Sequence, residues 1–359
     1  MNIENISHMN EKTEFDITGV HRYIPNSLRR TILSKIESIV FKGFPHMENN
    51  INITTNTTRF HNEYLKQRME CIPVMISNYS KFETYIKQYD YVLDVENTTS
   101  EKMVITTKDL RLRKIKDGEL KAKNLLPEYE GDHIPICYLY PRISQNDPTE
   151  KLSLSISLTK GSASENASWN VVSKCVFFNN EDTDEIQKQA SLIKDKSKLR
   201  DFMILDAQRI YIKDSFHMHI ENVGIYTCPV IITLACDILI NTLKAIEDEV
   251  DSTTYTNKDD MVIPNKQLIY LHNNKNTFMV RLEKEDYTIG TLIEYGLVKQ
   301  NGIKTVSFLK EHSHDKHCFI IVTLDMDVMD EEQEFKQLLK NGLRDIINIY
   351  TTIKNRFVN

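Results

Sequence analysis

The chain has 359 residues, of which 40% are hydrophobic and 27% are charged, a composition typical of a globular protein with two or three packed units. Its formal net charge of −6 argues against a general role in binding polyanions, because a protein that neutralises many phosphates normally carries a basic excess or a basic stripe. Six scattered cysteines without a CxxC pair favour reduced thiols in a cytosolic-type compartment and offer no paired ligands for structural zinc: Cys71, Cys137, Cys175, Cys228, Cys236 and Cys318.

The N-terminal residues contain no positively charged region leading into an apolar run, so no signal peptide is expected. A helix is predicted after a short strand that ends near residues 17–20, and Asn26 or Ser27 can accept hydrogen bonds from its first free amides. Its apolar residues recur at three- and four-residue steps and predict a buried stripe: Leu28, Ile32, Ile36 and Ile39. Arg29 and Arg30 lie at its start, either on a solvated face or against a partner that supplies acceptors.

The next segment predicts a strand at residues 51–54 and then a helix that Ile72–Pro73 ends. Glu63 and Arg68 lie on this helix, and by themselves they indicate a weak surface pair.

Residues 81–180 predict a strand-rich segment, in which alternating apolar residues over 152–158 mark a half-buried strand. The basic run 111–116 alternates like a strand edge or a hairpin, and this interpretation is favoured over contact with nucleic acid. Lys160–Gly161 begin a loop that leads to Trp169, but a single glycine is too little for a phosphate-binding loop.

Residues 181–200 predict a surface helix or loop, and residues 202–212 predict a strand. The following strand, 216–223, places His217 and His219 on one side. Two such histidines can bind a metal, but no third ligand lies nearby in sequence, so an exposed strand is favoured.

Pro229 is suited to the first turn of a long amphipathic helix. Its apolar face is predicted to comprise Ile231, Leu234, Ala235, Ile238, Leu239, Thr242, Leu243 and Ile246. The longest apolar run, residues 229–235, is too short to span a bilayer.

A polar stretch at residues 248–260 lacks apolar periodicity and predicts a linker. Beyond it the chain predicts strands at 278–282, 306–309 and 318–324, and helices from 285 and near the C-terminus. The apolar side of the last helix comprises Phe335, Leu339, Gly342, Ile346, Tyr350 and Ile353.

The segment His312–His317 is the one cluster that suggests an enzyme. Binuclear zinc hydrolases use His-x-His-x-Asp-His, but Asp315 falls one place too early for that ligand geometry. A polar β-turn is favoured. A metal-dependent hydrolase that uses His217, His219, His312, His314 and His317 is the alternative.

The stretch NSLRRTIL at residues 26–33 resembles the signature helix of alpha-type RNA polymerase subunits, the family of bacterial alpha, archaeal D and the third-largest eukaryotic subunit. Two later patterns are similar to that family in order and spacing: Asn56, Thr57, Glu63, Arg68, Ile72 and Pro73, then Lys160, Gly161, Ala167, Trp169 and Val171. Asn166 and Ser168 depart from the family's His and Lys. Residues 285–291 resemble a motif of the small alpha-like partner, archaeal L or the eleventh eukaryotic subunit; Glu285, Asp286, Thr288 and Gly290 match, and Tyr287 and Thr291 depart.

The resemblance implies an α+β chain in which the two subunits are fused, as in large cytoplasmic DNA viruses. The implied domains are a discontinuous dimerisation domain (1–45 and 201–250), an inserted β-rich domain (46–200), a linker (251–264) and a small alpha-like partner module (265–359), together an intrachain pseudo-heterodimer. Its implied dimerisation residues are Leu28, Ile32, Ile36, Leu234, Ile238, Thr288, Gly290, Leu339 and Ile346. Its implied subunit-assembly residues are Asn26, Arg29, Arg30, Glu63, Arg68, Lys160, Gly161 and Trp169.

The implied function is that of a non-catalytic assembly platform in a DNA-directed RNA polymerase. The implied partners are the largest and second-largest subunits and a small zinc-bearing subunit, with nucleic acid approached only through the complex and no membrane. We expect no cofactor or metal of its own and no homodimer, and a location in host cytoplasm and virion. A homodimeric interaction protein that uses only the first module is a third, weaker hypothesis.

Overall fold

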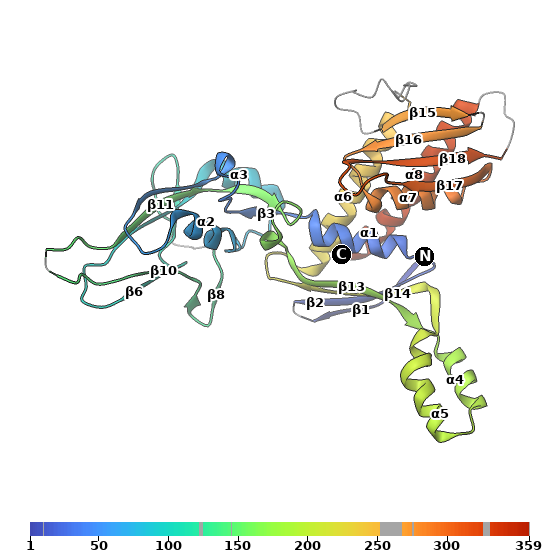
Figure 1. The fold of residues 1–359 in the computed structure, drawn as a ribbon, viewed down its shortest axis with the longest axis horizontal. Helices are drawn as coiled ribbons and strands as arrows, with labels where there is room; N and C mark the ends of the chain where they lie inside the picture. Colours follow the sequence, from blue (N-terminus) through green and yellow to red (C-terminus); the bar gives the residue numbers. More distant parts are fainter. Residues whose placement is uncertain are drawn as a thin grey trace. The chain divides into compact units, whose positions relative to one another are not determined.

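The structure is a computed structural model that describes residues 1–9, 11–121, 125–144, 146–251, 268–274, 276–325 and 331–358 (Figure 1). It divides into two compact units: the first comprises Met1–Ile32, Lys174–Glu221 and Cys228–Asn359, and the second comprises Leu33–Ser173 and Asn222–Thr227. Both combine sheets with helices, which confirms the predicted α+β class. The predicted linker, residues 251–264, lies outside the described residues except for Asp251.

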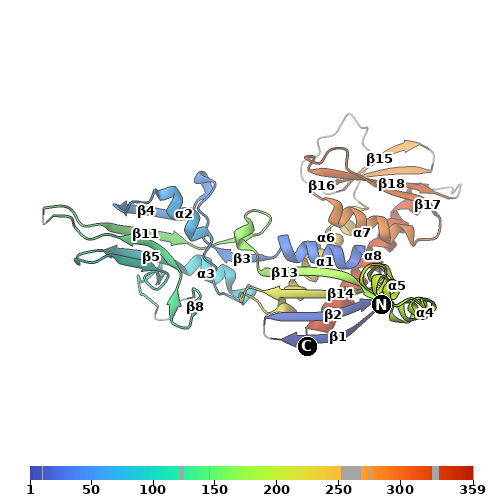
Figure 2. The same cartoon turned by 60° about the horizontal axis from the view of Figure 1, so that its bottom comes forward.

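A four-stranded sheet with the order β1-β2-β14-β13 forms one layer of the first unit (Figure 2). Its strands are β1 (Asn2–Met9), β2 (Lys12–Thr18), β14 (Tyr211–Asn222) and β13 (Val172–Glu181). Side chains along a strand point alternately to opposite faces. The face toward the core is therefore apolar, and it buries Phe15, Ile17, Phe216, Met218 and Ile220 completely.

Together with this sheet, the helices α1 (Tyr23–Ser34) and α6 (Cys228–Glu249) form what we call the first module. Proline fits the first turn of a helix, and both helices have one there, Pro25 and Pro229. By length and composition α6 could cross a membrane, with a mean hydropathy of 1.7 over its most apolar window. In the structure it is a packed helix, because it contacts β2 and α8 and buries apolar side chains along its whole length.

A second module follows within the same unit (Figure 1). Its elements are β15 (Leu268–Asn274), β16 (Thr277–Glu283), α7 (Tyr287–Val298), β17 (Ile303–Leu309), β18 (His317–Leu324) and α8 (Glu331–Phe357). The strands form an antiparallel sheet with the order β15-β16-β18-β17, against which α7 packs. The predicted elements are all present, and β15 is an additional strand.

The segment between β13 and β14 is helical where the sequence predicted a strand at 202–212. It contains α4 (Thr183–Leu192) and α5 (Lys196–Asp201), followed by a π-helical turn (Phe202–Asp206) and a 3-10 turn (Ala207–Arg209). Helical continuation lets Phe202 and Ala207 pack on Ile186, and β14 therefore begins only at Tyr211. Apolar runs of this length do not distinguish strand from helix by pattern alone.

The second unit is built on a sheet with the order β4-β11-β5-β7. Its elements are β3 (Glu37–Val40), β4 (Ile51–Asn56), α2 (Asn62–Glu70), α3 (Phe82–Gln88), β5 (Tyr89–Glu96), β6 (Met103–Thr106), β7 (Arg111–Lys114), β8 (Glu128–Tyr129), β9 (Asp132–His133), β10 (Pro135–Leu139), β11 (Lys151–Ser157) and β12 (Thr159–Ser162). Short 3-10 turns lie at His46–Glu48, Tyr79–Lys81 and Ala167–Trp169. The division differs from the expected insert of 46–200, because β13 belongs to the sheet of the first unit.

Candidate subunit-pairing and assembly site

Helix α1 begins earlier than predicted and ends earlier too. Asn26 is the fourth residue of the helix, so it is not the cap; its Oδ1 accepts hydrogen bonds from Arg29 Nε at 3.3 Å and Nη2 at 3.0 Å. The helix ends at Ser34, and Ile36 is buried in the second unit just before β3. The predicted stripe therefore stops at Ile32, and Ile36 has no place in the helix pairing of the first unit.

Arg30 joins α1 to the start of α7. Its Nη2 donates to Asp286 Oδ2 at 2.9 Å, and its Nε donates to Thr288 Oγ1 at 2.8 Å. Ser27 Oγ adds a hydrogen bond to the Thr288 carbonyl at 3.2 Å. The residue predicted to face another subunit thus contacts the second module of its own chain.

Asp286 caps α7 as well as holding Arg30. Its Oδ1 accepts the Thr288 amide N–H at 2.8 Å, which satisfies one of the free donors of the first turn. Burial raises the pKa of the Asp286 carboxyl, but the hydrogen bonds from Thr288 and the charge of Arg30 outweigh that effect, so the pKa lies below its usual value. The carboxylate form is therefore favoured by the pairing.

The buried contact between α1 and α8 is centred on Tyr350. Its hydroxyl donates to the Ile24 carbonyl at 3.2 Å in a completely buried position, and burial raises its pKa well above the usual value. Among the predicted dimerisation residues, Leu28, Ile32, Leu339 and Ile346 are all at most 1% exposed. These side chains belong to the core of the first unit.

The predicted apolar face of α6 is buried at five of its eight positions, which are Ile231, Ala235, Leu239, Leu243 and Ile246. Leu234 and Ile238 are only half-buried. The buried residues of α6 are Cys228, Ile231, Ile232, Ala235, Cys236, Leu239, Ile240, Leu243 and Ile246. The prediction was wrong at Leu234 and Ile238 because α6 is apolar around much of its circumference, so periodicity alone does not decide which side is buried.

Glycines allow close approach at two places in the second module. A Cβ on Gly290 would lie 2.0 Å from Phe308 Cε2, and a Cβ on Gly296 would lie 2.5 Å from the Gly342 carbonyl oxygen. Gly290 therefore leaves space for a ring of β17, and Gly296 and Gly342 let the backbones of α7 and α8 cross closely.

In the second unit the predicted assembly residues Gly161 and Trp169 form an internal contact. A Cβ on Gly161 would lie 2.5 Å from Trp169 Cε3, so glycine is needed for the indole to pack. Trp169 is 5% exposed and its Nε1 donates to the Glu70 carbonyl at 3.1 Å. Glu70, also 5% exposed, accepts the amides of Gly43 at 2.7 Å and Phe44 at 2.9 Å.

The other three predicted residues of this unit have separate surroundings. Lys160 Nζ pairs with Glu83 at 2.7 Å. Arg68 donates to the carbonyls of Ile136 at 2.8 Å and Pro135 at 2.7 Å, which replaces the expected pair with Glu63. Glu63 is exposed in the first turn of α2.

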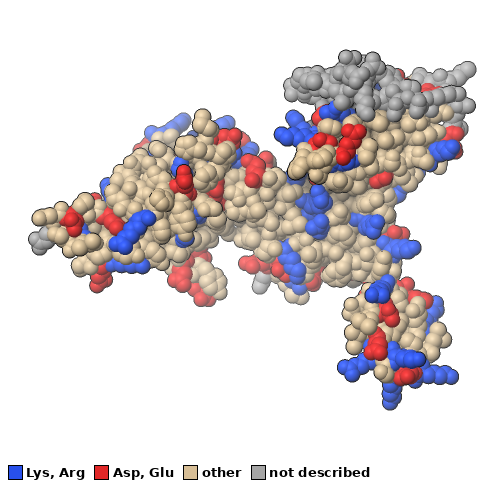
Figure 3. Space-filling view, in the orientation of Figure 1, with Lys and Arg blue, Asp and Glu red and all other residues tan. Residues whose placement is uncertain are grey.

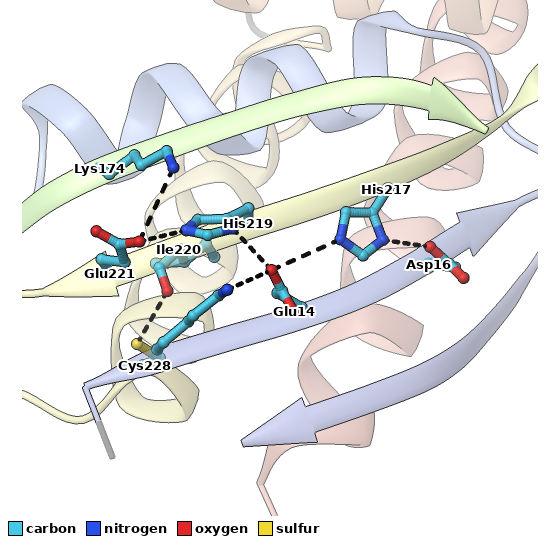
Figure 4. A network of polar contacts seen from close by, with 9 residues as sticks. Glu14, Asp16, Lys174, His217, His219, Ile220, Glu221 and Cys228 are labelled. Atoms are coloured by element: carbon cyan, nitrogen blue, oxygen red, sulfur yellow. Dashed lines mark hydrogen bonds and ion pairs between the residues drawn. The ribbon is translucent and has the colours of Figure 1, made fainter. Parts of the chain in front are cut away.

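The histidines of β14 lie in a polar network on the sheet (Figure 4). His217 Nδ1 is 2.7 Å from Asp16, whereas His219 contacts Glu14 at 2.8 Å through Nδ1 and Glu221 at 2.6 Å through Nε2. A hydrogen bond from Lys12 lowers the pKa of Glu14, and one from His219 lowers that of Glu221. His217 and His219 share a face because they are two residues apart on one strand, and the network pairs both with carboxylates of the same sheet.

The cluster at His312–His317 lies in the turn between β17 and β18 and ends at the first residue of β18, His317. Asp315 Oδ2 accepts the His312 amide at 3.0 Å, and the His312 carbonyl accepts the Asp315 amide at 3.1 Å. Within the described ranges no three His, Cys, Asp or Glu side chains are grouped so as to hold a metal ion. This arrangement does not favour the hydrolase alternative.

Charges of both signs are intermixed over the α4–α5 segment and over the second unit (Figure 3). In the basic run of β7, Arg113 Nε donates to Asp90 at 3.0 Å and Lys114 pairs with Asp117. Two of the basic side chains of this run, Arg113 and Lys114, are therefore paired with carboxylates of the same chain.

Sequence reasoning missed Glu70 and the buried hydroxyl of Tyr350. Glu70 had one detectable signal, a carboxylate on the apolar side of a short helix beside Leu65 and Met69. Tyr350 had been assigned only to an apolar stripe, and its carbonyl partner lies 326 positions away in sequence.

The fold and these contacts define a protein whose helices α1, α6 and α8 pair across two α+β modules. The profile of the family described as RNA polymerase Rpb3/Rpb11 dimerisation domain matches residues 14–243. The chain belongs to this family. It is also similar to DNA-directed RNA polymerase subunit Rpo11 of Methanopyrus kandleri, with 20% identity over 103 residues that cover 27% of this chain and 92% of that protein. These similarities support a role as an RNA polymerase subunit.

Proposed function

We propose that this chain is a non-catalytic assembly platform of a multisubunit DNA-directed RNA polymerase. In this proposal the first module acts as the alpha-type subunit and the second as its small partner, fused into an intrachain pseudo-heterodimer. Fusion makes their association intramolecular, so it does not depend on protein concentration.

The observation that carries the proposal is the contact of α1 with α7 and α8. Helix α1, which contains the signature-like stretch, makes two contacts with the second module. Arg30 binds Asp286 and Thr288 at the start of α7, and the Ile24 carbonyl accepts the hydroxyl of Tyr350 in α8. The two stretches that resemble the two subunits therefore meet within one chain, and the family match over residues 14–243 supports the first of the two resemblances.

The proposed partners are the largest and second-largest subunits and a small zinc-bearing subunit, in a viral enzyme of the host cytoplasm and virion. Of the proposed assembly residues, Arg29 is half-buried and Glu63 is exposed, so both are accessible to a partner. Asn26 orients Arg29. Arg30, Arg68 and Lys160 are also half-buried, but each already binds a partner in its own unit, and Gly161 and Trp169 are buried. In this proposal these five residues act indirectly, by fixing the surfaces on which Arg29 and Glu63 lie.

The test is co-purification of the full chain with co-expressed largest and second-largest subunits. Arg29→Ala should reduce recovery of the second-largest subunit by more than tenfold, because losing one partner of an interfacial charge pair costs about 2–5 kcal/mol. Arg29→Lys should restore binding only in part, since lysine lacks the planar fork of the guanidinium.

Lys35→Ala is the matched control, because Lys35 is an exposed cation just past the end of α1. Both alanine variants should keep the melting temperature of the wild type. Equal recovery of the second-largest subunit by both variants would refute the assembly role of Arg29.

A further inference from the structure

Three ion pairs connect α6 and the residues just after it to α8. Asp237 pairs with Lys354, Glu247 with Arg344 and Asp251 with Lys340, each at 2.6 Å. We call these six residues the α6–α8 seam.

The seam has one continuous antiparallel register. The ten-residue step from Asp237 to Glu247 matches the ten-residue step back from Lys354 to Arg344, and the four-residue step to Asp251 matches the step back to Lys340. A helix slipped by one residue would turn each side chain by about 100° and lose all three pairs. The charges therefore specify the register as well as the partner.

The two sides of the seam have opposite signs throughout. Every acid lies on the α6 side and every base lies on α8. On the α6 side the excess extends beyond the seam, because residues 228–251 have the acids Asp237, Glu247, Asp248, Glu249 and Asp251 against Lys244. On α8 the bases lie after the acidic first turn, which contains Glu331, Glu332 and Glu334, so the basic character belongs to the part of the helix that carries the seam.

We propose that this segregation of charge is the specificity determinant of the pairing. The acidic α6 accepts a basic helix of the α8 type in one antiparallel register and rejects the α6 of a second copy, and α8 likewise rejects a second α8. This inference rests on and deepens the proposed pseudo-heterodimer, because the repulsion of like charges would exclude pairing with identical copies.

The discrimination comes from repulsion more than from attraction. Each pair has a partner that is at least 37% exposed, and exposed ion pairs contribute little to stability individually. Like charges that face each other across an interface are much more costly, which is how charge usually excludes wrong partners. In this proposal the buried apolar residues of α6 stabilise the helix pairing, and the charges of the seam determine its specificity.

The test uses two triple variants of the full chain. The α6-basic variant is Asp237→Lys/Glu247→Lys/Asp251→Lys, and the α8-acidic variant is Lys340→Glu/Arg344→Glu/Lys354→Glu. Each variant alone faces like charges along the seam, and its melting temperature should fall by about 5–10 °C. The six-residue combination should melt like the wild type and remain a 42.0 kDa monomer.

Refolded together, the triple variants should exchange modules, because each carries the helix that the other lacks. The expected product is a 1:1 complex of twice the 42.0 kDa chain mass, measured by light scattering. Triple variants with wild-type melting temperatures and no mixed complex would overturn the proposal, as would a six-residue variant that stays destabilised.

Adjacent residues of α6 provide a milder test in case the triple variants fail to fold. Glu247→Lys should lower the melting temperature and Arg344→Glu should restore it. Asp248→Lys makes the same charge change at an exposed neighbour. It should have no such effect, and equal effects of the two lysine variants would also overturn the proposal. Every readout is a mass or a melting temperature of the isolated chain, so failure here is distinguishable from failure to recruit polymerase subunits.

Discussion

Gly296→Ala tests whether the close crossing of α7 and α8 holds the second module together. A Cβ at this position would lie 2.5 Å from the Gly342 carbonyl oxygen, 3.0 Å from its carbonyl carbon and 2.8 Å from Ile346 Cδ1. Two of these three obstacles are backbone atoms, which cannot rotate away as a side chain can. The helices must therefore separate locally, and α8 shifts relative to α6.

Two effects of opposite sign decide the magnitude. Alanine in place of glycine favours a helix by about 1 kcal/mol, whereas overpacking costs about 1–3 kcal/mol and occasionally more. Because the obstacle is backbone, we expect the upper end of the cost and a net loss of about 2 kcal/mol. For a unit of this size the melting temperature should fall by about 4–8 °C.

The assay is urea and thermal unfolding of the full chain, followed by circular dichroism. Val298→Ala is the control, because Val298 lies in the same helix and is 61% exposed, so its truncation should change stability by no more than about 0.5 kcal/mol. A Gly296→Ala protein that is as stable as the wild type, or more stable, would show that helix propensity dominates and that the crossing tolerates separation.

Three further outcomes are expected. Gly161→Ala should shift the fluorescence emission of Trp169, the single tryptophan, and cost about 1–3 kcal/mol, because the new Cβ would meet the indole at 2.5 Å; an unchanged spectrum and stability would contradict that packing. A double-mutant cycle of Arg30→Ala and Asp286→Ala should give a coupling energy of only about 0.2–1 kcal/mol, because these side chains are 40% and 44% exposed, and zero coupling would mean that the pair does not hold α1 to α7. Since the folded pKa of Asp286 lies below its usual 3.8, its stabilising effect is complete above about pH 5 and is lost as the pH falls through the folded pKa. The stability advantage of the wild type over Asp286→Asn should disappear between about pH 5 and pH 2, and an advantage that does not change over this range would refute the assignment.

The family membership was visible in the sequence because it depends on short local patterns. The stretch at residues 26–33 and the motif at 285–291 identified the polymerase resemblance, and the family match over residues 14–243 supports the first of these. The strands of the second module were equally predictable, since β-branched and aromatic alternation is a local property.

The side of a helix that is buried was not predictable where the helix is apolar on several sides. Leu234 and Ile238 fit the period of α6 as well as the residues that are buried, and only the position of α8 decides between them. The partner of Arg30 could not be predicted from the sequence for a related reason. A half-exposed arginine on a helix is compatible with solvent, another subunit or a carboxylate far along the chain, and the structure places Asp286 at 2.9 Å from Arg30.

By itself the sequence determined which segments fold as helices and strands over most of the chain, and to which family the chain belongs. Both follow from periodicity and motif spacing, which depend only on residues that are close together in sequence. Only the tertiary structure decided which side of α6 is buried, that β13 joins the sheet of the first unit, and that three acids meet three bases in one register along α6 and α8. The physical reason is that these contacts join residues tens to hundreds of positions apart. Their energies depend on distances that no local pattern encodes.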